Sequence, residues 1–195
     1  VENEGLSEGD CIDLRGNPLS EESVNIYIPQ LEARGVNVLY DAPKTWYVDD
    51  DLADYPDADF TKVQNAVDVA SSGDTIIVYP GTYTENIDIN TDNLTIQSEN
   101  GAETTIVQAA NPDDYVLEVA ANYVSISGFT IEGAQYSSSW MAGICLCGTE
   151  LANIHHCNVS ANVVLNNANG INLHHSSKVM SQFSCKNFWP GYLQC

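Results

Sequence analysis

The chain has 195 residues and a mass of 21.2 kDa, enough for one medium-sized domain or two small ones with a buried core. It carries 27 acidic and 6 basic residues, for a formal net charge of −21. This charge repels nucleic-acid backbones and anionic lipid, and the longest apolar runs are far shorter than the roughly 20 residues of a membrane span. We therefore expect no nucleic-acid partner and no membrane insertion within this segment.

Residues 1–41 predict a small α/β unit. Its first apolar residues surround Asn17, which is the strand-then-asparagine pattern of leucine-rich repeats. A helix is then predicted that bends at Pro29 and ends at Gly35, before a strand over residues 36–40. The apolar face of this helix would comprise Val24, Tyr27, Ile28 and Leu31.

This unit resembles the last repeat and C-terminal cap of a leucine-rich-repeat domain. The resemblance rests on the sequences LRGNPLS at residues 14–20 and YIPQLEARGV at residues 27–36, a form associated with microbial surface proteins. One repeat cannot bury its own apolar face, because such arrays need about three or more units. Either the natural protein starts earlier or this unit packs on the next part of the chain, and we interpret the chain as a fragment of a larger modular protein.

Residues 42–59 predict a strand that leads into an acidic loop. Six aspartates occur there within eleven positions: Asp49, Asp50, Asp51, Asp54, Asp57 and Asp59. Carboxylate oxygens are ligands that Ca²⁺ prefers, so Asp49, Asp51 and Asp54 are candidate calcium ligands. The loop lacks the spacing of an EF-hand, and a solvated acidic face is the alternative.

Residues 60–195 predict a capping helix followed by the coils of a parallel β-helix. The helix has Asp59 as its candidate N-cap and an apolar face of Phe60, Val63, Val67 and Ala70. Short strands then begin at Ile87, Leu117, Ile144 and Ile171, at intervals of 30, 27 and 27 residues. We call each such repeat a row. The second strand of a row carries an apolar pair five residues apart, and these pairs are Ile126 with Ile131, Ile154 with Val159, and Met180 with Cys185. Such periods, with Asn and Gly at corners, describe stacked coils, although the alternation is lost over the last 20 or so residues.

The run from Asp59 to Glu85 resembles the N-terminal cap of the pectate-lyase-like right-handed parallel β-helix superfamily. Together with the later rows, the resemblance covers roughly residues 46–175. It implies an all-β fold, a right-handed parallel β-helix with an N-terminal capping helix, here preceded by the small leucine-rich-repeat-like α/β remnant. Within the superfamily the chain is similar to surface proteins of the carbohydrate-binding and sugar-hydrolysis type and to NosD-type copper-binding repeats.

The turn Gly81–Glu85 also resembles pectin methylesterases. The chain has no equivalent of that family's QDTL, DFIFG or LGRPW segments, so we interpret Tyr83 and Glu85 as cap residues. By resemblance to pectate lyases, a lyase mechanism would need an arginine base on a coil, whereas both arginines, Arg15 and Arg34, lie in the first unit. A lysine base is the alternative, but the alignment of the coils places none of Lys62, Lys178 and Lys186 beside a carboxylate cluster.

A glycosidase would need two carboxylates about 5 to 10 Å apart. Asp88 and Glu118 occupy matching outward positions of neighbouring rows, so they stand one coil apart. The alternative is that the two side chains are solvent-exposed neighbours on stacked strands without a catalytic role, where their like charges slightly lower the stability.

Histidine and cysteine gather near the C-terminal end of the chain. Aligning the rows sets Cys147 against His174, and places Cys145 and His155 nearby. Imidazole and thiolate bind Zn²⁺ or copper, so the candidate ligands are Cys147, His155, His174 and His175. The spacing matches no standard zinc signature. The alternatives are exposed polar corners or a disulfide between Cys157 and Cys185.

These observations predict a non-catalytic β-helix module, extracellular or at the cell surface, for adhesion or carbohydrate binding. The expected partner is an extracellular polysaccharide or a surface glycoprotein, with Tyr123, Tyr136 and Trp140 as candidates for stacking on sugar rings. Buried packing of these rings is the alternative. Two other functions remain open, a polysaccharide lyase or glycoside hydrolase and a copper- or zinc-binding NosD-like β-helix. Calcium is the first candidate cofactor, and copper or zinc the second.

Overall fold

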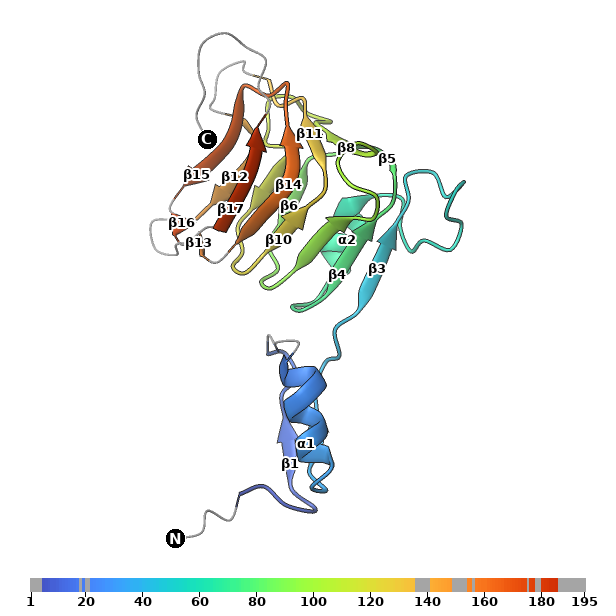
Figure 1. Cartoon of the computed structure of the whole chain (residues 1–195), viewed down its shortest axis with the longest axis vertical. Coiled ribbons are helices and arrows are strands. Elements are labelled where there is room, and N and C mark those ends of the chain that lie inside the picture. The colour runs from blue at the N-terminus through green and yellow to red at the C-terminus, as the bar shows by residue number, and fades with distance from the viewer. Residues whose placement is uncertain are drawn as a thin grey trace.

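The computed structural model describes residues 5–17, 19, 22–135, 141–148, 154–155, 157–174, 176–177 and 180–185. These residues form a small N-terminal unit and a larger stack of parallel strands, joined by a single extended connection (Figure 1). Two separate apolar clusters support this division, because one contains residues between 12 and 40 and the other residues between 46 and 171. The domain bounds 1–41, 42–59 and 60–195 stay predictions.

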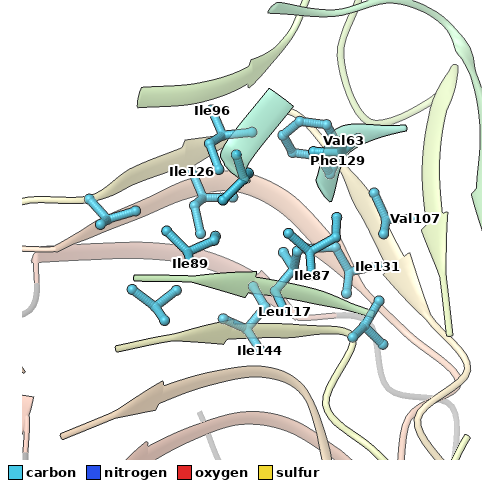
Figure 2. Close-up of a cluster of buried hydrophobic side chains, with 14 of the residues drawn as sticks. Val63, Ile87, Ile89, Ile96, Val107, Leu117, Ile126, Phe129, Ile131 and Ile144 are labelled. Atoms are coloured by element: carbon cyan, nitrogen blue, oxygen red, sulfur yellow. The ribbon is translucent and has the colours of Figure 1, made fainter. Parts of the chain in front are cut away.

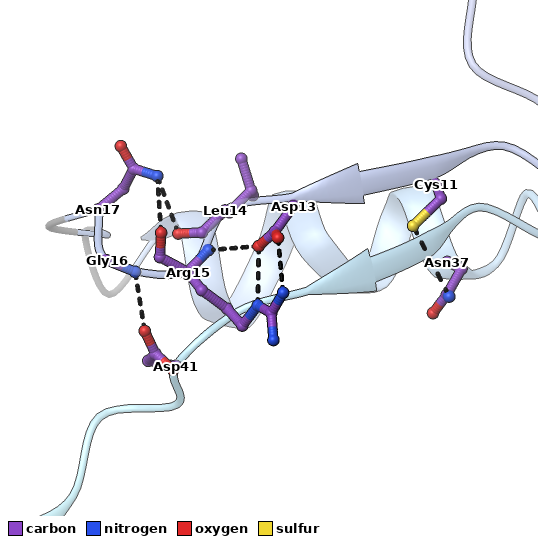
Figure 3. A network of polar contacts seen from close by, with 8 residues as sticks. All are labelled: Cys11, Asp13, Leu14, Arg15, Gly16, Asn17, Asn37 and Asp41. Carbon is purple, nitrogen blue, oxygen red and sulfur yellow. Dashed lines mark hydrogen bonds and ion pairs between the residues drawn. The ribbon is translucent and has the colours of Figure 1, made fainter.

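The N-terminal unit consists of two parallel strands with a helical segment between them. Its elements are β1 (Cys11–Asp13), a π-helical turn (Ser23–Tyr27), α1 (Ile28–Glu32) and β2 (Asn37–Leu39). The turn after β1 is held by polar contacts, since the Asn17 amide donates to the Leu14 carbonyl at 3.0 Å (Figure 3). Arg15 forms an ion pair with Asp13 at 2.7 Å and lowers the pKa of that exposed carboxyl to about 2. The leucine-rich-repeat origin of this unit stays a prediction.

The predicted helix face in this unit is partly wrong. Ile28 is buried, but Tyr27 is exposed and its hydroxyl donates to Glu22 at 2.8 Å. The reason is the π-helical turn, in which the Ile28 amide donates to the Ser23 carbonyl five residues earlier and shifts Tyr27 off the buried face. Pro29 lacks an N–H, so it is accommodated in the first turn of α1.

The larger unit is the right-handed parallel β-helix that the sequence predicts. Its elements are β3 (Thr45–Val48), α2 (Val63–Val69), β4 (Thr75–Val78), β5 (Gly81–Thr84), β6 (Ile87–Ile89), β7 (Thr95–Ser98), β8 (Thr105–Gln108), β9 (Leu117–Val119), β10 (Ser125–Ser127), β11 (Thr130–Glu132), β12 (Ala142–Cys147), β13 (Ile154–His155), β14 (Asn158–Val164), β15 (Asn169–His174), β16 (Ser176–Ser177) and β17 (Met180–Cys185). Strands β3, β4, β7, β10 and β14 form one face, β5, β8, β11 and the end of β14 a second, and β6, β9, β12 and β15 a third.

The predicted row register of the third face is confirmed. Ile87 pairs with Leu117, Leu117 with Ile144, and Ile144 with Ile171. Figure 2 shows apolar side chains from successive coils pointing into one shared interior. This stacking buries alternate residues in strands such as β4, β6 and β8, which is why short period-2 strands with these spacings specify the fold.

The predicted apolar pairs are wrong from β14 onward, since Met180 is in register with Asn158 and Ser181 takes its predicted place. Val159 pairs with Ile126, and Val164 with Ile131, so the pair five residues apart in this coil is Val159 with Val164 and not Ile154 with Val159. Strand β14 continues around the corner between two faces, with Ala161 at a φ of 54°. An uninterrupted strand at a corner has no turn signal, so the sequence pattern places the pair one strand too early.

The N-terminal end of the β-helix is covered by α2, whose Val63, Ala66 and Val67 side chains are buried in the main core. The helix begins at Val63, and the predicted N-cap Asp59 instead accepts a hydrogen bond from the Tyr47 amide at 2.9 Å. Glu85 takes the capping role, because the amides of Val63 and Gln64 donate to its two carboxylate oxygens at 2.9 and 3.0 Å.

None of the helices in the described part of the chain has the length and hydropathy of a membrane span.

Candidate functional site

Three consecutive aspartates converge where β3 ends. One carboxylate oxygen from each of Asp49, Asp50 and Asp51 lies within 4.8 Å of the others, and we call these residues the acidic triad. Among the described residues this is the group of three ligating side chains that could share one metal ion. Asp50 also accepts a hydrogen bond from the Thr82 amide at 2.9 Å, which ties the loop to β5.

Asp49 is the unusual member of the acidic triad. It is 1% exposed, and its Oδ2 is buried without a hydrogen-bond partner. Burial raises the pKa of this carboxyl, amides of Leu52 and Tyr55 that donate to it oppose the rise, and the charges of Asp50 and Asp51 add to it. The Oδ2 atom of an ionised Asp49 lacks the hydrogen bond or ion that ordinarily compensates a buried charged oxygen.

The acidic triad overlaps the predicted calcium ligands only in part. Asp49 and Asp51 lie together as the prediction requires, whereas Asp54 is exposed and outside the group. Asp50 was not among the predicted ligands. Its place depends on Gly81, where an added Cβ would lie 2.6 Å from the Asp50 carboxylate. This approach joins residues 31 positions apart, so no local sequence signal reveals it.

Three tyrosine rings stack beside the acidic triad, and we call them the tyrosine stack. The rings of Tyr55 and Tyr79 are 3.6 Å apart and 4° from parallel, and those of Tyr47 and Tyr79 are 6.0 Å apart at 17°. Tyr47 lies on the outer face of β3, where it is in register with Ile77, two residues before Tyr79. Such diagonal neighbours in a sheet are within reach of aromatic side chains. The sequence alone did not single out these rings, because the contact depends on strand register.

The tyrosine stack lies near the acidic triad, because Tyr47 is two residues before Asp49 and the charge of Asp49 acts on Tyr79. The pKa of Tyr79 is raised by burial first, and then by the neighbouring groups Tyr47, Glu99, Tyr55 and Asp49. Tyr47 keeps 39% of its surface exposed. The site therefore combines an accessible aromatic ring with carboxylate acceptors on one end of the β-helix.

Of the aromatic residues predicted to stack on sugars, Tyr123 lies within the described residues. It is 52% exposed at the turn between β9 and β10, with a φ of 58°. Tyr136 and Trp140 lie outside the described residues.

Of the predicted histidine and cysteine ligands, Cys147 and His174 lie outside the one group of three ligating side chains found in the described residues, and a metal site at these residues stays a prediction. Cys147 is in register with His174, as the row alignment predicts, but Cys147 forms a disulfide with Cys145. A disulfide sulfur is not the thiolate that zinc or copper binds, so in this form Cys147 offers no ligand. His155 lies in β13, which pairs with β16 in a separate small sheet, and His175 lies outside the described residues.

The alternative disulfide between Cys157 and Cys185 is also wrong. Cys185 is in register with Val164, at the far end of β14 from Cys157. Cys157 is buried, and its thiol donates to the Ala121 carbonyl at 3.3 Å. The wrong apolar pair at β14 explains the error. It aligned Cys185 with Val159, five residues before its partner Val164. The disulfide between Cys145 and Cys147 fits an oxidising, extracellular compartment.

Asp88 and Glu118 are in register on neighbouring strands, as predicted. The pKa of Glu118 is raised by partial burial first, and then by the charges of Asp88 and Asp114. The raised pKa means that the folded chain holds the Glu118 proton more tightly than the unfolded chain does. The contribution of Glu118 to stability is therefore fully present where Glu118 is protonated, and it is lost as the pH rises from the unfolded pKa of about 4.3 through the raised pKa.

We expect Glu118→Gln to stabilise the chain at pH 7 by about 0.2–1 kcal/mol, because it removes a like-charge contact between neighbouring strands that solvent partly screens. The gain should vanish below pH ~4, where Glu118 is protonated in both states. Thermal unfolding at pH 7 and pH 3.5 measures this, with the exposed Glu103→Gln as the control. An equal effect of both substitutions at pH 7 would contradict the assignment.

Comparisons with known proteins agree with the fold and with a surface location. No family model matches the chain. The chain is 35% identical over 109 residues to a cell surface glycoprotein of Methanothermus fervidus, a match that covers 55% of this chain and 16% of that protein. The chain thus spans about a sixth of the length of this relative. The match supports an extracellular or cell-surface location.

A solved structure is similar in fold. It is a pectin methylesterase mutant in complex with a hexasaccharide, with a TM-score of 0.52 and 12% identity, covering 72% of this chain and 50% of that one. At this identity the likeness shows the parallel β-helix fold alone.

Proposed function

We propose that this chain is a non-catalytic carbohydrate-binding module of a surface or secreted protein, and that the tyrosine stack is its docking surface. The single observation that carries this proposal is the packing of three tyrosine rings beside three carboxylates, with Tyr47 accessible on the outer face of β3. The surface-glycoprotein relative and the hexasaccharide complex of the structural neighbour support it.

The chemistry of the site suits a sugar. An aromatic ring offers a flat apolar surface to the C–H face of a pyranose, and its hydroxyl remains available for hydrogen bonding. Asp49 is buried, but the partly exposed Asp50 and the exposed Asp51 can accept hydrogen bonds from sugar hydroxyls, which fixes the orientation of a ligand held mainly by apolar contact. Tyrosine is enriched at binding surfaces for the same reason.

The charge of the chain selects among carbohydrates. A net charge of −21 repels polyuronates and sulfated chains, so the favoured ligand is a neutral polysaccharide. The same argument disfavours an acidic pectin substrate of the kind that the fold neighbour's name suggests.

We expect Tyr47→Ala to weaken polysaccharide binding at least about tenfold, because truncating an aromatic anchor removes more than about 1.4 kcal/mol. Affinity electrophoresis through gels that contain neutral or anionic polysaccharides measures the dissociation constant from the retardation. Tyr123→Ala, which removes an exposed ring elsewhere on the β-helix, is the matched control. Retardation lost with Tyr123→Ala and kept with Tyr47→Ala would move the docking surface to the turn after β9, and no retardation in any gel would refute the proposal.

A glycoside hydrolase is the second candidate, because Asp88 and Glu118 lie on adjacent strands about 4.8 Å apart, close to the carboxyl separation of retaining enzymes. The raised pKa of Glu118 is the direction a general acid requires. Release of reducing ends from a neutral polysaccharide by the wild-type chain, abolished by Glu118→Gln, would establish this function in place of the first.

A further inference from the structure

We propose that the acidic triad, Asp49, Asp50 and Asp51, is a binding site for one divalent cation, with Ca²⁺ as the favoured ion. The inference concerns cation binding alone and does not depend on the proposed carbohydrate ligand. Its basis is geometric, because one oxygen from each side chain lies within 4.8 Å of the others, a separation that a single ion can bridge.

The second observation is the buried oxygen of Asp49. This Oδ2 has no hydrogen-bond partner, and the residue is 1% exposed. Leaving a carboxylate oxygen buried without a donor is unfavourable, and bound cations are one of the two usual ways to compensate it. The other way is an ion pair, and among the described residues the ion pair that forms joins Asp13 to Arg15 in the N-terminal unit.

The donor set selects the ion. Three carboxylates are hard oxygen ligands, which favour Ca²⁺ or Mg²⁺ over the zinc and copper that imidazole and thiolate bind. Consecutive loop residues give an irregular cage, and Ca²⁺ tolerates irregular geometry whereas Mg²⁺ requires a near-ideal octahedron. The Thr82 amide donates a hydrogen bond to the Asp50 carboxylate at 2.9 Å, so at least one ligand is positioned before the ion binds.

A bound ion would also act on the loop that carries the triad. The loop contains Leu52 at a φ of 59°, an unfavourable conformation for leucine. Tyr55, four residues beyond the triad, packs at 3.6 Å on Tyr79. An ion at the triad would therefore hold the loop, and with it Tyr55, against the β-helix.

Isothermal titration of the whole chain with CaCl₂ alone, at roughly physiological ionic strength, tests the proposal. We expect one site with a dissociation constant of about 10⁻⁴–10⁻³ M, the range of extracellular modules, and weaker binding of MgCl₂. Asp51→Asn should weaken Ca²⁺ binding about tenfold or more, because it removes one charged ligand. Asp54→Asn, in the same loop but outside the triad, should change it less than about twofold.

A charge-neutral variant separates a built site from the diffuse counterions of an acidic protein. Gly81→Ala keeps the net charge, but its methyl group would displace the Asp50 carboxylate, so Ca²⁺ binding should weaken here too. Circular dichroism confirms that each variant is folded, and the exposed Asp51 makes Asp51→Asn safe for the fold. The absence of Ca²⁺ binding in the wild-type chain, or equal affinities for Asp51→Asn and Asp54→Asn, would overturn the proposal.

Discussion

Replacing Phe129 with alanine should lower the free energy of unfolding of the β-helix by about 3–5 kcal/mol, the largest effect that we expect of any single substitution. Phe129 is 2% exposed at the corner between β10 and β11, and its ring points into the interior (Figure 2). It lines a small apolar cavity of about 10 Å³ together with Ile87, Val107 and Ile126. Removing the ring would enlarge that cavity, which has no polar group to hold water.

Urea unfolding followed by circular dichroism measures this loss. Phe129→Leu is the matched control, since it keeps most of the apolar volume and should cost roughly half as much. Stacked coils need not unfold in one step, so native-state hydrogen exchange at β10 and β11 should accompany the titration. A loss below about 1 kcal/mol for Phe129→Ala would show that the interior of this coil is not packed as described.

Replacing Asn162 with alanine should cost about 2–4 kcal/mol, the second largest expected effect. Asn162 is 4% exposed at the corner within β14. Its Oδ1 accepts a hydrogen bond from the Phe129 amide and its Nδ2 donates to the Ile126 carbonyl, both at 2.9 Å. These two backbone groups belong to the preceding coil, and without Asn162 the Phe129 amide would lose the hydrogen bond that it donates and the Ile126 carbonyl would lose one of its donors.

Thermal and urea unfolding of Asn162→Ala test this prediction. Asn158→Ala is the control, because Asn158 is exposed on the same strand and its loss should change stability by less than about 0.5 kcal/mol. Equal costs for the two variants would mean that the bonds from Asn162 do not join the coils.

The sequence predicts the coils well because one physical signal defines them. Alternating apolar residues at Ile87, Leu117, Ile144 and Ile171 stack only in a single register, since a slip by one residue would expose all of them. The same signal fails at corners. At β14 the chain bends without a break, so the pattern does not identify Val159 and Val164 as the apolar pair of this coil. The predicted Cys157–Cys185 disulfide is wrong for the same reason, because Cys185 is in register with Val164.

The remaining errors come from contacts between distant residues. Asp59 stands where a local N-cap would stand, but Glu85 reaches the helix from a strand end 22 residues away. Asp49 and Asp51 can be proposed from composition alone, whereas the place of Asp50 depends on the neighbouring Gly81. Propensity and spacing carry no information about such approaches, which arise only once the coils are stacked.

The tyrosine stack could not be predicted from the sequence either, because it also depends on contacts between distant residues. Among the aromatic candidates chosen from the sequence, Tyr123 lies in the turn between β9 and β10, where exposure is expected. Tyr47 and Tyr79 instead meet on the outer face of adjacent strands, and Tyr55 joins them from the acidic loop. Only the register of β3 with β4 brings them together.

The most direct test of carbohydrate docking at the tyrosine stack is NMR with ring-¹³C tyrosine. The oligosaccharide added is one derived from whichever neutral polysaccharide retards the chain. We expect the ring signals of Tyr47, Tyr55 and Tyr79 to shift on titration while that of Tyr123 does not. Shifts at Tyr123 alone, or no shifted tyrosine at saturating ligand, would contradict it.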